Sequence, residues 1–73
     1  MGAKNYLASN PESRMIYEAI VSGGPMTSAA IGRIFPEIDS HRRRSIMFQL
    51  RLYGLVERVY PERSCRYLWR AMS

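Results

Sequence analysis

The chain has little of the chemistry that stabilises secreted proteins or holds metals. It contains one cysteine, Cys65, and one histidine, His41, so it cannot form an internal disulfide or a zinc site of cysteines and histidines. We therefore expect no metal, no cofactor and a reducing compartment, the cytoplasm. No apolar run approaches the roughly 18 residues of a membrane span, and residues 1–10 lack the apolar segment of a signal peptide. The sequence predicts neither export nor a membrane partner.

Groups that could perform catalysis are also scarce. Cys65 and His41 are the only pair of the nucleophile–base type, and we expect them on different elements with no carboxylate to orient the imidazole. The Gly23-Gly24 pair lacks the lysine and the spacing of a phosphate-binding loop. The sequence therefore predicts a protein that is not an enzyme.

The apolar residues that are present suffice for one small core. The chain has 73 residues, of which 47% are hydrophobic and 11% aromatic. A chain of this size buries about 60–65% of its unfolded surface when it folds, which allows one domain. We expect that domain over residues 10–73. Residues 1–9 have no clear periodicity and predict a flexible N-terminal arm, with Tyr6 and Leu7 as possible anchors.

Positive charge is concentrated in the second half of the chain. The net charge is +5, yet residues 1–39 hold three basic and four acidic side chains, whereas residues 40–73 hold eight arginines and two glutamates. Ten of the eleven basic residues are arginine, whose planar fork suits phosphate groups and guanine edges. This distribution favours a polyanionic partner, the alternative being a basic surface that only aids solubility.

Turn and cap residues divide the middle of the chain into three expected helices. The first has Asn10 as its N-cap and ends at Gly23. The second follows Thr27 as its N-cap and ends before Pro36. The third covers residues 40–53, with Asp39 or Ser40 as its cap and Gly54 at its end.

After Gly54 the sequence changes to a strand pattern. Residues 55–60 and 65–71 are rich in Val, Tyr, Leu and Trp, and residues 61–64 separate them, which predicts a β-hairpin. We expect Tyr60, Tyr67 and Trp69 to be core aromatics of this hairpin rather than surfaces for base stacking. The predicted fold class is α+β, with a hairpin at the C-terminal end of a three-helix unit.

Three segments resemble the winged helix-turn-helix family. Residues 26–32, MTSAAIG, resemble the opening of its second helix, a hydrophobic residue followed by T-x-x-x-I and a small residue. Residues 50–58, LRLYGLVER, resemble its L-x-x-x-G-L-V-x-R junction, and residues 66–69, RYLW, resemble its returning strand. The resemblance spans residues 11–71. It implies a small phage or bacterial type of transcriptional regulator that binds double-stranded DNA sequence-specifically, with residues 55–71 as the wing.

The helix over residues 40–53 would then enter the major groove with its N-terminal part. Its first turn has three consecutive arginines near the positive end of the helix dipole, an arrangement that costs roughly 0.3–1 kcal/mol for each exposed charge. Arginine can read guanine, and a phenylalanine can contact a thymine methyl group. The expected DNA contacts are Ser40, His41, Arg42, Arg44, Ser45 and Phe48. The alternative is a basic helix end that is only solvated.

Two further sets of residues are expected to contact phosphate. The wing presents Arg58, Arg63, Ser64 and Arg66, which can follow phosphates or enter a minor groove, or can merely protect a strand edge. Thr27 and Ser28 begin the second helix, where backbone amides favour phosphate, although Thr27 also serves as a cap.

The outward face of the third helix has a second interpretation. In the register fixed by Gly54, Phe48 and Leu52 point outward, and we expect the stem of Arg43 to run along the edge of the core with its guanidinium in solvent. A single module buries only roughly 600–1,000 Å² on DNA, so we expect a homodimer or cooperative assembly through Phe48 and Leu52, or through Tyr6 and Leu7. The alternative function is a protein-interaction domain that docks a partner protein on Phe48 and Leu52.

Overall fold

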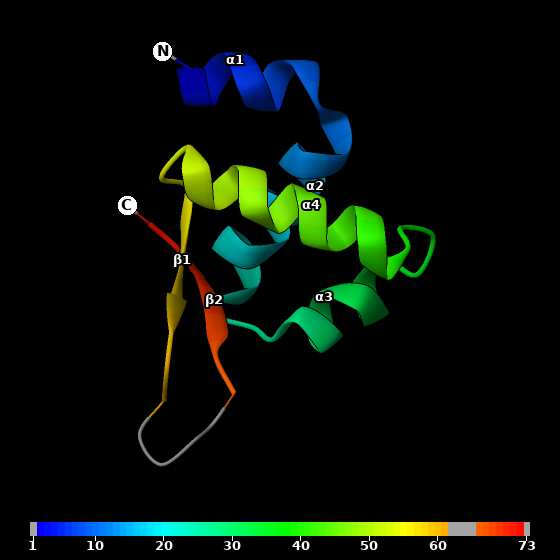
Figure 1. The fold of residues 1–73 in the computed structure, drawn as a ribbon, viewed down its shortest axis with the longest axis vertical. Helices are drawn as coiled ribbons and strands as arrows, with labels where there is room; N and C mark the ends of the chain where they lie inside the picture. The colour runs from blue at the N-terminus through cyan, green and yellow to red at the C-terminus, as the bar shows by residue number, and fades with distance from the viewer. Residues whose placement is uncertain (1, 62–65, 73) are drawn as a thin grey trace.

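The fold is α+β, with four helices and an antiparallel hairpin that follows them (Figure 1). The structure is a computed structural model that describes residues 2–61 and 66–72. The elements are α1 (Gly2–Ser9), α2 (Pro11–Gly23), α3 (Ser28–Ile34), α4 (Ser40–Leu52), β1 (Val56–Val59) and β2 (Leu68–Ala71). The three helices and the hairpin predicted after residue 10 are confirmed, with strands shorter than the sequence predicts. Within these described ranges no helix is long and apolar enough to cross a membrane.

The N-terminal segment differs from the flexible arm that the sequence predicts. Gly2–Ser9 forms α1, whose Tyr6 contacts Ser13 of α2 and Tyr53 at the end of α4. The Tyr6 ring stacks on Tyr53 with 4.5 Å between centroids, and its hydroxyl lies 2.8 Å from the hydroxyl of the buried Ser13. Leu7 also packs against the core. Both anchors therefore contact their own chain, and the periodicity of so short a segment could not reveal contacts with partners as distant as Tyr53.

The caps of the helices follow the prediction at two of three positions. The Thr27 hydroxyl accepts from the Ala30 N–H at 3.1 Å, and the Asp39 carboxylate accepts from a backbone N–H of α4 at 2.7 Å. Asn10 occupies the N-cap position of α2, but its side chain makes no capping bond there. It donates instead to the Tyr6 carbonyl at 2.8 Å, because the C-terminal carbonyls of α1 also lack helical partners.

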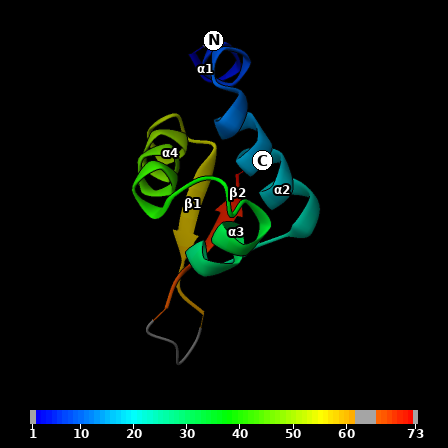
Figure 2. The same cartoon turned by 90° about the vertical axis from the view of Figure 1, so that its right-hand side faces the viewer.

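One apolar core joins the helices to the hairpin. β2 packs on α2 and β1 packs on α4, so the hairpin lies between these two helices (Figure 2). Met15 on α2 and Ile34 on α3 are exposed, whereas Ile38 in the loop before α4 is buried. The buried apolar residues are Ile16, Ile20, Ile31, Phe35, Ile38, Ile46, Met47, Leu50, Val56 and Trp69. Trp69 is thus a core aromatic as predicted, whereas Tyr60 is exposed.

The register of the hairpin fixes which side chains face α4. Val56 pairs with Ala71 and Arg58 pairs with Trp69, and because side chains alternate along a strand, these four share one face. The buried Val56 and Trp69 show that this is the core-facing side near α4. The segment before α3 is joined to β2 by an antiparallel bridge between Met26 and Trp69, with backbone N–H to carbonyl distances of 3.1 and 2.8 Å.

Candidate functional site

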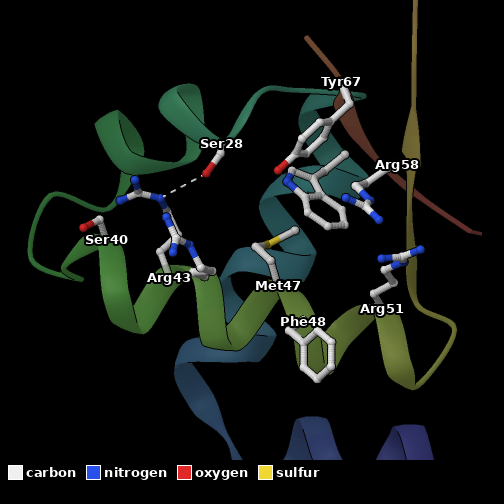
Figure 3. A pocket seen from close by; sticks show the side chains of 10 residues that line it. Ser28, Ser40, Arg43, Met47, Phe48, Arg51, Arg58 and Tyr67 are labelled. Carbon is white, nitrogen blue, oxygen red and sulfur yellow. Dashed lines mark hydrogen bonds between the residues drawn. The ribbon is translucent and has the colours of Figure 1, made fainter. Parts of the chain in front are cut away.

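A cleft of about 330 Å³ lies between α4, the start of α3 and the hairpin (Figure 3). It brings Ser28 of α3 together with residues that follow it by 12 to 41 positions in the chain. We call it the arginine cleft, since among the described residues that line it four are arginines and none is acidic. It is lined by Ser28, Ser40, Arg43, Arg44, Met47, Phe48, Arg51, Arg58, Tyr67 and Trp69.

Helical periodicity brings the α4 residues of the cleft together. Arg44, Met47, Phe48 and Arg51 are spaced at i, i+3, i+4 and i+7, which places them along one side of the helix. Met47 is buried toward the core, whereas Arg44 and Arg51 are exposed. Neither arginine has a carboxylate within ion-pair distance in the described part of the chain. The cleft side of α4 therefore carries two uncompensated positive charges.

The hairpin contributes the opposite wall of the cleft. Arg58 is exposed, and its guanidinium carbon lies 5.4 Å from the centre of the Tyr67 ring, a cation–π arrangement. Tyr67 in turn meets Trp69 edge to face, with 5.4 Å between ring centroids. Among residues 2–61 and 66–72 no carboxylate pairs with Arg58. Figure 3 shows the side chains of Arg51 and Arg58 extending into the same space from the two walls.

Arg43 connects the floor of the cleft to α3 rather than projecting into solvent. It is half-buried, and its Nε donates to the Ser28 hydroxyl at 3.4 Å (Figure 3). Its guanidinium reaches Gly32, where an added Cβ would lie only 2.9 Å from one of its nitrogens. The sequence predicts this guanidinium in solvent, whereas the structure places it against Ser28 and Gly32 of α3, where the small residue at position 32 provides the space.

The opposite side of α4 has its positive charge paired. Arg42 donates from Nε to the Glu12 carboxylate on α2 at 2.9 Å, with both side chains about half exposed. The sequence predicts DNA contacts from both Arg42 and Arg44, but only Arg44 lines the cleft, whereas Arg42 pairs with Glu12. On the far face of the hairpin, Arg70 is likewise paired with Glu57. Pairing thus distinguishes these two arginines from those of the cleft.

The remaining predicted site residues fall into three groups. Ser40, Arg44 and Phe48 line the arginine cleft together with Arg58, while His41 and Ser45 are exposed on α4 beside it. Thr27, Ser28 and Arg66 line an adjoining cleft of about 460 Å³, which shares Ser28 and Tyr67 with the first. Arg63 and Ser64 lie outside the described residues.

One exposed arginine of the cleft is not among the site residues predicted from the sequence. Arg51 was not predicted to contribute, although its i+7 spacing from Arg44 is a signal that could have identified it. The outward position of Phe48 and Leu52 is confirmed, since their exposed fractions are 56% and 65%. The indole Nε1 of Trp69 is buried and has no hydrogen-bond partner among the described residues.

The arrangement suits the binding of an anion better than the binding of a metal. Within residues 2–61 and 66–72 no three His, Cys, Asp or Glu side chains lie close enough to hold a metal ion. Comparison with protein-family models, with curated proteins and with solved structures gives no match.

Proposed function

We propose that the chain is a winged helix-turn-helix protein that binds double-stranded DNA sequence-specifically and acts as a transcriptional regulator. In this proposal α4 enters the major groove and the hairpin is the wing. The observation that carries it is the arginine cleft, where Arg44, Arg51 and Arg58 have no acidic partner in the described residues, beside an exposed helix. The element order of α2, α3, α4 and hairpin supports the assignment of the wing.

The exposed side of α4 has the size and the chemistry for base contacts. The helix has 13 residues, which corresponds to roughly 20 Å at 1.5 Å for each residue, and a major groove about 12 Å wide admits such a helix. Arg44 can donate two hydrogen bonds to one guanine, and Phe48 can contact a thymine methyl group. His41 and Ser45 are exposed next to them. Arg42, which is paired with Glu12, has no assigned base contact in this proposal.

The test is a titration of the protein with random duplex DNA across a salt series, followed by selection of preferred sequences. We expect affinity to fall steeply with salt and the selection to enrich one motif, because phosphate contacts release counterions and base contacts discriminate. The Arg44→Gln variant should lose much of its preference for that motif. An Arg70→Gln variant, which removes a charge already paired with Glu57, is the matched control. Weak binding at low salt with no enriched sequence would contradict the proposal.

The exposed apolar pair on α4 favours a second candidate function, which is the docking of a partner protein. Phe48 and Leu52 are neighbours at i and i+4 on the outward face of the helix. Their replacement by Ser should leave the thermal unfolding curve almost unchanged, because neither side chain is buried. Under this alternative the double variant loses partner binding and retains DNA binding. Under the DNA proposal it loses motif preference instead.

A further inference from the structure

We propose that the arginine cleft binds a small organic dianion with an apolar body, the chemistry of an aromatic dicarboxylate, and that this ligand and DNA exclude each other. The ligand site is inferred from the cleft alone, whereas the exclusion rests on the proposed DNA-binding function. The cleft measures about 330 Å³, near the lower limit of the roughly 300–1,000 Å³ of small-molecule sites. Its size therefore suits a compact ligand.

Two positive charges without acidic partners face the same space in the cleft. Arg51 comes from the last turn of α4 and Arg58 from β1, and their guanidinium groups extend toward that space in Figure 3. Neither is paired with a carboxylate in the described part of the chain. A carboxylate can accept paired hydrogen bonds from one guanidinium, and a second carboxylate can do so from the other. The two walls therefore favour a dianion over a monoanion.

A buried donor without a partner belongs to the same cleft. Trp69 is 6% exposed, and its indole Nε1 is the one buried side-chain nitrogen or oxygen among the described residues that lacks a hydrogen-bond partner. Such groups are usually paired, because an unpaired buried donor lowers stability. Nε1 is covered in the structure, so an acceptor reaches it only after a neighbouring side chain rotates. Tyr67, which meets the indole edge to face, is the ring that we expect to move.

The apolar part of the lining accounts for the body of the ligand. Met47 lines the cleft from the side of the core, and the ring of Phe48, which is 56% exposed, lines it from the outer side of α4. A thioether and an aromatic ring both make favourable contacts with a planar aromatic group. An inorganic ion would meet the guanidinium groups and leave these apolar side chains uncovered. The lining therefore favours an aromatic dicarboxylate over inorganic phosphate.

The ligand would regulate the proposed function through residues that both partners use. Arg44 and Phe48 line the cleft and are also the proposed base contacts. A bound dianion would cover them and would add two negative charges among the arginines that attract DNA. A saturating ligand should therefore weaken duplex binding, and a duplex should weaken ligand binding by the same factor, because coupling between two sites is reciprocal.

The first experiment titrates the full chain with phthalate, isophthalate and terephthalate by calorimetry and by the fluorescence of Trp69, the only tryptophan. We expect one isomer to change the fluorescence and to bind roughly tenfold more tightly than benzoate or inorganic phosphate, since each of these lacks one of the two kinds of contact. Arg51→Gln and Arg58→Gln should each weaken its binding roughly tenfold. Both side chains are exposed, so these variants should remain folded. Arg14→Gln removes an exposed charge of α2 outside the cleft and should bind as the original protein does.

The second experiment repeats the titration of a selected duplex in the presence of the preferred isomer, with benzoate at equal ionic strength as the control. We expect the dicarboxylate, and not benzoate, to weaken duplex binding. If no isomer binds more tightly than benzoate and phosphate, or if Arg14→Gln loses as much affinity as the cleft variants, the ligand site is wrong and selective DNA binding can still stand. If the isomer binds as expected but leaves the affinity for a selected duplex unchanged, the exclusion is wrong. If the isomer binds and no duplex is selected, the site is supported and the proposed function fails, together with the exclusion.

Discussion

The two sides of α4 carry the same residue type in different electrostatic states. On one side Arg42 meets Glu12 of α2 at 2.9 Å. On the other side Arg44 and Arg51 border the arginine cleft with no carboxylate partner in the described chain. The difference arises from the neighbouring elements, because α2 offers an acid whereas the facing hairpin offers Arg58. Arginine content alone therefore does not distinguish the two sides of α4, whereas local pairing with carboxylates does.

The largest expected effect is a loss of DNA affinity when the cleft arginines, rather than the paired arginines, are replaced. We expect replacement of Arg44, Arg51 and Arg58 together by Gln to weaken duplex binding on the order of 100-fold near 0.15 M salt, from roughly fivefold for each lost contact. Arg42→Gln with Arg70→Gln should weaken it by less than about threefold, since each lost charge was already paired. Titrations of both variants on one labelled duplex provide the measurement. Equal losses would remove the distinction between the two sides.

A second prediction concerns α1, whose Tyr6 contacts the C-terminal end of α4 and should stabilise the fold without contacting DNA. Tyr6→Ala removes a hydrogen bond to Ser13 and a ring stack on Tyr53, and should lower the free energy of unfolding by about 2 kcal/mol. Tyr6→Phe keeps the stack and should cost about 1 kcal/mol. Urea denaturation measures both values. Under conditions where each variant is fully folded, its affinity for DNA should not change. A change in affinity without a change in stability would place α1 in the binding surface.

A third prediction concerns a variant in which Arg42 lacks a carboxylate partner, as the cleft arginines do. Glu12→Gln removes the partner of Arg42 and adds one unit of positive charge at the surface of α2. We expect the free energy of unfolding to change by less than about 1 kcal/mol, as is usual for an exposed ion pair. Duplex affinity at low salt should rise roughly two- to fivefold through the added long-range attraction, and this gain should vanish at high salt. A gain that persists at high salt would indicate instead that Arg42 makes a direct contact.

The smallest expected effect tests the floor of the cleft. In Gly32→Ala the new methyl group must displace the guanidinium of Arg43, which is the flexible end of a long side chain. The helix gains up to about 1 kcal/mol in propensity and loses the contact between Arg43 and Ser28, so the net change in unfolding free energy should be within about 0.5 kcal/mol. Thermal unfolding measures it. A loss above about 2 kcal/mol would show that the position of Arg43 is fixed by more than this contact.

The sequence predicted the elements whose limits are set locally and failed where distant residues decide. Thr27, Asp39 and Gly54 mark helix ends by their own chemistry, and these ends were predicted correctly. The helix α1 could not be foreseen, since its anchor Tyr6 depends on Ser13 in α2 and on Tyr53 at the C-terminal cap of α4. The same reason explains Asn10, a good N-cap by type, whose side chain bonds to the preceding helix instead.

The candidate site shows the same division. The sequence indicated a basic α4, but Arg42 and Arg44 lie about 200° apart around a helix axis, and only the tertiary fold brings Glu12 to one of them. Arg58 was predicted for the wing, yet its place opposite Arg51 depends on how the hairpin packs against α4. Helical spacing from Arg44 could have placed Arg51 in the cleft. Which of the described arginines are paired with carboxylates could be learned only from the structure.

The bridge between Met26 and Trp69 has a consequence for motion. Its two backbone hydrogen bonds attach the segment before α3 to the strand that returns along the cleft. A displacement of β2 is therefore transmitted to the first turn of α3, and the two should fluctuate together as one body against α4. Amide hydrogen exchange at Met26 and Trp69 should accordingly proceed through one shared opening event with the same free energy.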